Sequence, residues 1–395
     1  ASFDAITRYV ASIDSNRTPF TTIANPFPSG MVSPTGSSLG LATELGNAIS
    51  FVDSRRVLPY VQQWQLSFQR ELPSRMRVET AYVGVLSLKL LEDFSLNEKP
   101  DVYLALGTAE NESVRNPFYG IFPSTSTLGA GATFTRNRTW VRFPQFPSVT
   151  AVGMNTARTI YHGLQFRLEK RLTHGLALGG SYTNSKVMEY LATSVINERH
   201  YRSVSDVDHP QIVRLYATYE LPVGRRRALG GNWPAWLDYG LGNWAISGSL
   251  ALTSGDALQV TERRGRPIPI RAAALSGSVK DRLGDRIDPA TKLPANPYFD
   301  TTAFVRLKDD YTITPEPLRL DWLRGPRQRS TALSLLKTFR FAERFRMELR
   351  GEFSNPTNTP SFGNPGTDMS SPATFGVINE GGGARSIQLG ARLRF

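Results

Sequence analysis

The chain of 395 residues contains no cysteine. This excludes disulfides, thiolate metal sites and cysteine nucleophiles together. The absence suits a protein that crosses an oxidising periplasm unfolded, where a free thiol would be a hazard. The sequence also lacks an uninterrupted apolar run of about 18 residues, which excludes a transmembrane helix. A membrane-spanning strand is still allowed, because it needs only about 9–11 residues and alternate ones can be polar.

Positive charge is in excess, with 46 Lys and Arg against 34 Asp and Glu and a net charge of +12. Such an excess can indicate nucleic-acid binding when the charges form one tract. Here they alternate with apolar residues inside strand-like segments. We therefore expect basic side chains that line a lumen or lie beside anionic lipid head groups, and no nucleic-acid partner.

Alternation of apolar and polar residues is the main structural signal, because successive side chains of a strand point to opposite faces. It predicts nine spanning strands, at roughly 60–71, 75–90, 158–171, 176–189, 209–222, 240–257, 329–341, 345–357 and 385–395.

The connections between these segments alternate in length. Tight turns at 72–75, 172–175 and 341–345, and a longer aromatic connection at 223–243, alternate with Gly- and Pro-rich excursions at about 92–157, 190–208, 258–328 and 358–384. Loops this long are rare in compact soluble domains. Short turns on one rim and long loops on the other are typical of an outer-membrane barrel. The fold class we predict is all-β, an antiparallel transmembrane β-barrel with long extracellular loops.

The polar sides of several strands carry charged residues that we predict to face the lumen. They are Arg167, Glu169, Arg214, Arg346, Glu348, Arg350 and Glu352. They are candidates for contact with a plug or a solute. The alternative is that the arginines pair with Glu169, Glu348 and Glu352 across neighbouring strands. A soluble sandwich exposing such a stripe to water is also compatible with these segments alone.

The last segment alternates up to the final residue. Its apolar members Ile387, Leu389, Leu393 and Phe395 resemble the C-terminal signal that the barrel-assembly machinery reads. This places the C-terminus in the periplasm. Nine strands then begin by running downward, whereas a whole bacterial barrel has an even number. Residues 1–58, which show no signal peptide, are therefore predicted to be an extracellular loop region, and 59–395 the C-terminal part of a barrel. The missing strands would come from an upstream part of the gene product or from a partner chain.

Short motifs along nearly the whole chain resemble Oar-like TonB-dependent outer-membrane receptors. They include Tyr60-Val61-Gln62-Gln63-Trp64, Asn116-Pro117-Phe118-Tyr119-Gly120, Tyr161-His162-Gly163-Leu164-Gln165 and Tyr219-Glu220-Leu221-Pro222-Val223-Gly224, with further matches at 69–73, 81–84, 142–146, 168–171, 181–186, 355–358 and 362–365.

The resemblance implies the later strands of a 22-stranded barrel in the Gram-negative outer membrane. It also implies a plug preceded by a carboxypeptidase-regulatory-like sandwich, and uptake of a scarce ligand driven through TonB. The implied partners are outer-membrane lipid and lipopolysaccharide, the barrel-assembly machinery, the plug with the upstream strands, and indirectly the TonB complex. This sequence contains no recognisable plug, TonB-contact segment or upstream barrel strands, so we expect uptake only when the plug and the upstream strands are joined to it.

Ligand contacts are expected from long-loop residues, for which Asn116, Phe118, Tyr119, Trp140 and Phe146 are the candidates. Their alternative role is packing of loop on loop.

No cofactor, metal or catalytic constellation is predicted, and the chain is not expected to be an enzyme. Asp206, Asp208 and His209 are a weak metal candidate beside the simpler interpretation of a polar loop, and Asp309 and Asp310 lack the spacing of a calcium loop. Glu348 and Glu352 share a face as glycosidase carboxylates do, but the interleaved Arg346 and Arg350 favour a charge ladder. Two other functions stay open: a structural or adhesive barrel component that docks on partner proteins, and a soluble basic β-sandwich that binds polysaccharide or nucleic acid.

Overall fold

A computed structural model describes residues 5–225, 227–262, 268–269, 271–273, 275, 279–282, 288–292, 294–307, 311–313, 317–340 and 346–395. Strands dominate these residues, and α1 (Ala235–Leu241) is the one α-helix among them. Within the same ranges, no helix combines the length and the apolar character needed to cross a bilayer.

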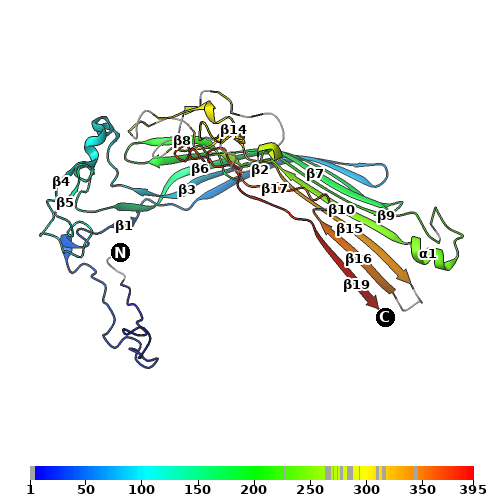
Figure 1. Cartoon of the computed structure of the whole chain (residues 1–395), viewed down its shortest axis with the longest axis horizontal. Helices are drawn as coiled ribbons and strands as arrows, with labels where there is room; N and C mark the ends of the chain where they lie inside the picture. The colour runs from blue at the N-terminus through cyan, green and yellow to red at the C-terminus, as the bar shows by residue number, and fades with distance from the viewer. Residues whose placement is uncertain are drawn as a thin grey trace. The chain divides into compact units, whose positions relative to one another are not determined.

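Nine strands form one antiparallel sheet. In chain order they are β2 (Tyr60–Leu72), β3 (Met76–Ser95), β6 (Val149–Thr173), β7 (Leu176–Ser194), β9 (Gln211–Glu220), β10 (Trp244–Thr253), β15 (Gln328–Arg340), β16 (Arg346–Ser354) and β19 (Ser386–Arg394). Each pairs with its neighbours in this order, with β2 and β19 at the two ends (Figure 1). All nine predicted strands are therefore confirmed.

Three strands are longer than predicted. β3 and β7 continue past 90 and 189, and β6 begins nine residues before 158. The predicted excursions at 92–157 and 190–208 are correspondingly too long. Apolar and polar residues alternate poorly in the added segments, which contain Gly153 and Asn155. The strands therefore extend through backbone pairing with neighbouring strands and not through an alternating side-chain pattern. The predicted turn at 341–345 lies outside the described residues.

Shorter elements lie in the connections. β1 (Ile49–Val52) pairs in parallel with β6, and β8 (Arg199–Val204) pairs with β7. Four two-stranded ladders join β4 (Ser113–Arg115) to β5 (Thr133–Thr135), β11 (Ala257–Leu258) to β14 (Leu320–Arg324), β12 (Ile268–Pro269) to β13 (Phe304–Val305), and β17 (Ser361–Phe362) to β18 (Gly381–Gly382). The 3-10 helices are η1 (Gly40–Ala42), η2 (Asp101–Asn111), η3 (Arg136–Trp140), η4 (Val279–Arg282) and η5 (Thr301–Ala303).

The chain divides into two compact units. One comprises Ala1–Pro59, Lys89–Ala157 and Ala192–His200, and the other comprises Tyr60–Leu88, Arg158–Leu191 and Tyr201–Phe395. The second unit holds most of the sheet and the connections after β9. The predicted boundary after residue 58 is a different kind of division, by side of the membrane, and stays a prediction.

The turn between β6 and β7 shows why the short connections are tight. Thr173 pairs with Leu176, so only His174 and Gly175 make the turn. Both have positive φ, at 52° and 78°. Such two-residue turns match the right-handed twist of the strands they join. A Cβ on Gly175 would lie 2.7 Å from the carbonyl oxygen of Glu220, so glycine is required here for space as well as for φ.

The strand register sorts the side chains of the sheet into two faces. We call them the apolar face and the polar face. Leu215 of β9 pairs with Gly180 of β7 on one side and with Leu250 of β10 on the other, and Leu250 pairs with Thr331 of β15. Followed in this way from strand to strand, the register shows which residues of β6 to β19 share a face. Contacts of His162 with Trp64 and Tyr82 place β2 and β3 on the same apolar face. Its large members are Trp64, Leu66, Phe68, Tyr82, Leu164, Phe166, Tyr182, Leu215, Tyr219, Ile246, Leu333, Leu349, Ile387, Leu389 and Leu393.

These apolar side chains are not covered by the protein. Leu66 is 76% exposed and Leu389 is 79% exposed, whereas Phe299 and Leu323 in the connections are 1% and 2% exposed. The buried core lies between the β10–β15 and β16–β19 connections, where Phe299, Phe304 and Phe375 pack edge to face. Apolar residues inside and polar residues outside is the usual arrangement in water. The sheet reverses it on one face.

Two lysines mark the short-turn end of the apolar face. The Nζ of Lys170 bends to the carbonyl oxygens of Thr173 and Leu176, at 3.3 and 2.9 Å, and to the Thr173 hydroxyl at 2.6 Å. Lys337 is 2% exposed, bonds to the carbonyl of Gly242 after α1, and its ammonium lies 5.4 Å from the Trp244 ring centroid. Long basic side chains at an apolar boundary bend their charge toward polar groups in this way.

The apolar face predicts a side-specific response to charge. In the full-length protein folded into lipid vesicles, Leu389→Arg should lower the free energy of unfolding by about 2–4 kcal/mol, because it puts an arginine against hydrocarbon. Gln388→Arg, the adjacent position on the polar face, is the matched control and should be near neutral. Urea titration followed by Trp fluorescence gives both values. Equal effects at the two positions would contradict the assignment of faces.

Candidate functional site

The polar face collects all seven charged residues predicted from the sequence. Arg167 and Glu169 lie on β6, Arg214 on β9, and the other four on β16. The register puts Arg214 opposite Ser181, and Glu348 and Glu352 opposite Arg392 and Gln388 of β19. The seven residues therefore share one side of the sheet, opposite Leu389 and its row. That this side lines a lumen stays a prediction.

Pairing on the polar face follows the charge ladder. Arg346 lies 3.0 Å from Glu348, and Arg350 lies 3.3 Å from Glu352, both pairs on β16. On β6, Glu169 lies 3.2 Å from Arg77 of β3 and 3.8 Å from Arg167. The two glutamates of β16 are thus neutralised by adjacent arginines. This arrangement is the charge ladder that the interleaved arginines predicted.

The five loop candidates lie in the first unit, where the side chains of three of them contact other residues of the same loop. The buried Asn116 donates from Nδ2 to the carbonyls of Leu128 and Gly131, both at 2.6 Å. Phe118 stacks on Phe122 with ring centroids 4.8 Å apart, and Trp140 stacks on Tyr103 at 5.0 Å. The carbonyl of Phe146 accepts a bond from Asn97, and Tyr119 is exposed. Tyr119 is thus the side chain most open to an external molecule, and ligand contact stays a prediction.

The C-terminal candidates lie together on the apolar face of β19. Leu389 pairs across from Gly351, Leu393 from Met347, and Ile387 from Phe353. Phe395 follows the end of the strand and is exposed. β19 pairs with β16 on one edge only, within the described part of the chain. Their role as an assembly signal stays a prediction.

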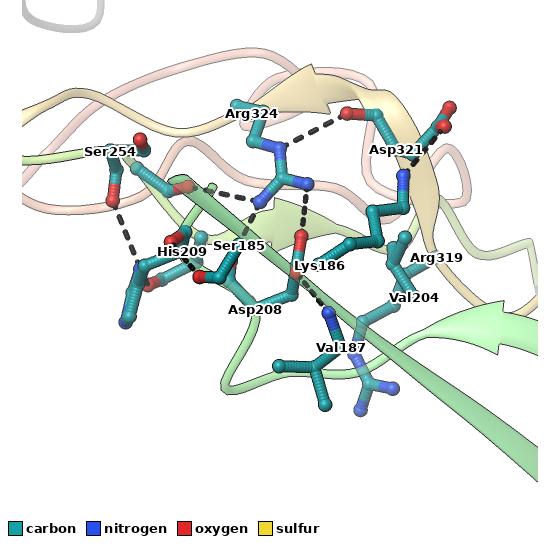
Figure 2. Close-up of polar contacts among 12 residues, drawn as sticks. Ser185, Lys186, Val187, Val204, Asp208, His209, Ser254, Arg319, Asp321 and Arg324 are labelled. Atoms are coloured by element: carbon teal, nitrogen blue, oxygen red, sulfur yellow. Dashed lines mark hydrogen bonds and ion pairs between the residues drawn. The ribbon is translucent and has the colours of Figure 1, made fainter. Parts of the chain in front are cut away.

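A buried ion pair fastens the β10–β15 connection to the sheet (Figure 2). Asp208, between β8 and β9, is fully buried, accepts a bond from Val187 N at 2.6 Å, and lies 2.5 Å from the guanidinium of Arg324 at the end of β14. Arg324 also donates to the carbonyls of Asp208 at 2.7 Å and Asp321 at 3.0 Å. We call Asp208 and Arg324 the clasp.

Further contacts surround the clasp on both sides. Arg319 pairs with the buried Glu189 of β7. Lys186 lies 3.0 Å from Asp321 (Figure 2). The Nδ1 of His209 lies 3.0 Å from the Ser254 carbonyl. The carboxylate of Asp208 is therefore held by an arginine, and no group of three metal-ligating side chains occurs among the described residues. Asp309 and Asp310 lie outside those residues.

Tyr298 links the clasp to the buried core of the connections. Its hydroxyl donates to the Arg324 carbonyl at 3.0 Å, and burial raises the pKa of this hydroxyl, so it stays a donor at neutral pH. Nearby, bonds from Thr302 and Arg271 lower the pKa of Asp300 and keep its carboxylate ionised. Apolar packing in the core and polar contacts of Tyr298 and the clasp therefore act together to hold the β10–β15 connection in place.

Sequence reasoning did not identify the clasp, the loop core or the basic residues near β8. Arg324 lies 116 residues from Asp208, and no local pattern connects them. The one available signal was the polar run before β9, for which the sequence offered a polar loop and, less favourably, a metal site.

Comparison with known proteins agrees with the geometry. A sequence model of the family described as "Outer membrane beta barrel domain" matches residues 2–388. No curated protein sequence matches the chain.

Several solved structures resemble the chain at low identity. The outer membrane transporter YddB from Escherichia coli is 8% identical with a TM-score of 0.43, over 89% of this chain and 34% of that one. The ferripyoverdine receptor of the outer membrane of Pseudomonas aeruginosa is 9% identical with a TM-score of 0.38, over 85% and 27%. The FrpB iron transporter from Neisseria meningitidis is 9% identical with a TM-score of 0.35, over 88% and 32%. This chain thus spans between about a quarter and a third of the length of these proteins.

The clasp predicts a local loss of stability when one partner is removed. Asp208→Ala leaves the Arg324 guanidinium without its carboxylate in a buried site, which costs about 3–5 kcal/mol. We expect protease cleavage in 254–327 to speed up by at least tenfold. Asp321→Asn, which breaks the exposed pair with Lys186, should cost no more than about 1 kcal/mol and serves as the control. Similar cleavage rates in both variants would argue against the clasp.

The absence of cysteine allows a direct test of the two faces. Ser249 and Leu250 are adjacent on β10 and lie on the polar and apolar faces. In membranes, Ser249→Cys should react with a water-soluble maleimide, and Leu250→Cys should react only after the membrane is dissolved, because hydrocarbon excludes the reagent. Mass spectrometry of the labelled protein gives the extent of reaction. Equal reaction at the two positions before solubilisation would contradict the assignment of one face to lipid and the other to water.

Proposed function

The chain belongs to the family of outer membrane beta barrel domains, and from this premise we propose that it forms the later strands of an Oar-like TonB-dependent receptor. In this proposal the complete gene product binds a scarce ligand outside the cell and takes it up across the outer membrane. The motifs quoted for the Oar-like family extend from Tyr60 to Pro365 and are the observation that carries the subtype.

The two faces of the sheet support a wall between lipid and a wide lumen. The polar face is charged along β6, β9 and β16, and on β16 four charged residues follow one another at every second position. A narrow barrel fills its interior with its own side chains, whereas barrels of about 22 strands enclose a plugged lumen. Charged side chains such as Arg350 and Glu352 suit water or a polar plug surface. The same faces disfavour a soluble sandwich, because Leu66, Phe68 and Leu389 would stand in water.

The direction of the two edge strands sets a condition on how the barrel closes. β2 runs toward its short turn with β3, and β19 runs the same way, since Ser386 pairs with Ser354 at the long-loop end and Arg394 with Arg346 at the other. Unpaired backbone groups are costly in lipid. Antiparallel closure therefore requires an odd number of further strands between β19 and β2. A 22-stranded barrel meets this condition with thirteen.

The remaining parts of the proposal come from the resemblance. The plug and the upstream strands complete the barrel, TonB drives the plug, and the barrel-assembly machinery reads β19. The short turns and the C-terminus face the periplasm, and the long connections face outward, with Tyr119 as an exposed candidate for ligand contact. A structural or adhesive component would use the same wall without a plug.

Removal of the plug separates these two functions without knowledge of the ligand. Cells that make the complete gene product should resist vancomycin, which is too large for general porins. Deletion of the plug-encoding segment in the same reading frame should make them sensitive, because the lumen is then open. The measurement is the minimal inhibitory concentration at matched amounts of folded barrel in the membrane. Unchanged resistance, or an upstream reading frame without a plug, would reject the receptor and favour the structural component.

A further inference from the structure

We infer that the outer side of the barrel wall carries a binding site for the phosphate groups of lipopolysaccharide, built around Tyr190. Arg158 of β6 pairs across from Tyr190 of β7, with its guanidinium 4.2 Å from the ring centroid. Arg202 of β8 reaches the same ring at 5.6 Å. We call these three residues the basic site. Both arginines are exposed, and no carboxylate pairs with either guanidinium among the residues that the structure describes.

The basic site lies on the apolar face. Tyr190 is eight residues beyond Tyr182 on the same strand, and even-numbered residues of β7 share that face. Phe166 and Leu164 follow on β6, opposite Tyr182 and Asn184. The arginines therefore do not point to the polar face, where the charge ladder of β16 lies. They stand on the side that lipid covers.

The height of the basic site matches the lipid head groups. Lys170 marks the lower boundary of the apolar face, and Arg158 stands twelve residues before it on β6. At about 3.3 Å per residue and a strand tilt of about 40°, this spacing is roughly 30 Å along the barrel axis. The apolar band of such barrels is about 25 Å tall. Arg158 and Arg202 therefore lie above the hydrocarbon, on the long-loop side, with His162 and Lys186 of the same face between them and the apolar rows.

A hollow next to the ring adds room for a head group. It has a volume of about 400 Å³ and is lined by Lys186, Met188, Arg202, Arg319 and Trp322, among others. Lys186 and Arg319 have acidic partners, whereas Arg202 faces both the hollow and Tyr190. A planar guanidinium binds phosphate with two parallel hydrogen bonds, and stacking on an aromatic ring orients it for this. The aromatic and thioether side chains suit the sugar and the upper acyl carbons.

The charge and the position together select the ligand. The outer leaflet of this membrane is built from a phosphorylated glycolipid, so an anion of high local concentration lies at this height. Basic residues near an anionic membrane surface contribute about 1 kcal/mol each. An external protein is a less suitable occupant, because the site stands on the face of the wall that continues downward into the apolar rows of Leu164 and Phe166.

The test measures binding of diphosphoryl lipid A to the full-length protein in detergent. Arg158→Gln with Arg202→Gln should weaken binding roughly 30-fold, from two charges at about 1 kcal/mol each. Arg158→Lys with Arg202→Lys should retain most of the affinity. Arg392→Gln with Arg394→Gln removes the same charge from the polar face of β19 and should leave binding within about twofold. Heat-modifiable migration in gels confirms that each variant is folded.

Three results would overturn the inference. The first is unchanged lipid A binding in the folded glutamine variant. The second is equal binding of dephosphorylated lipid A, which would exclude the phosphates. The third is equally tight binding of inorganic phosphate, which would exclude a lipid as the occupant. None of these results depends on transport, so the inference and the proposed receptor function fail separately.

Discussion

One sheet in this protein has to satisfy two solvents. Its register places rows of large apolar side chains, such as Leu66, Leu215 and Leu389, on one side and charged or hydroxyl side chains on the other. Apolar surface in water costs about 25 cal/mol per Å², so a sheet with so many exposed aliphatic and aromatic residues is stable only when hydrocarbon covers it. The family of outer membrane beta barrel domains supplies that environment. The other features of the chain follow from this constraint.

The boundary of the hydrocarbon is visible in where charge appears on the apolar face. At the short-turn end, Lys170 and Lys337 bend their ammonium groups to backbone carbonyls, and Trp244 and Phe339 surround the second of them. At the other end, Arg158 and Arg202 both contact the ring of Tyr190, and both side chains are exposed. The two ends differ because backbone carbonyls accept hydrogen bonds from the lysines, whereas no carboxylate pairs with either arginine among the described residues. That difference is the physical basis of the inferred lipid site.

The connections at the long-loop end of the sheet bury apolar residues inside, as a soluble protein does. The β10–β15 and β16–β19 connections bury their own core around Phe299, and the clasp of Asp208 and Arg324 holds the first connection to the sheet. A buried pair of this kind adds little net stability over an apolar pair, but it penalises any arrangement that separates the partners. The clasp therefore specifies one position of a long connection. In the receptor that we propose, this connection presents a binding surface at a defined position on the wall of strands.

The amino-acid sequence by itself determined the strands and their faces, because period two is a local property and turns such as His174-Gly175 bound each strand. It also placed Arg346, Glu348, Arg350 and Glu352 on one side correctly. It overestimated the excursions around β3, β6 and β7, since pairing of backbone groups extended those strands without an alternating pattern. The tertiary structure alone decided the clasp, the loop core and the contact of Arg158 and Arg202 with one tyrosine. Those contacts join residues up to 116 positions apart, and only the register of neighbouring strands brings such distant side chains within reach of one another.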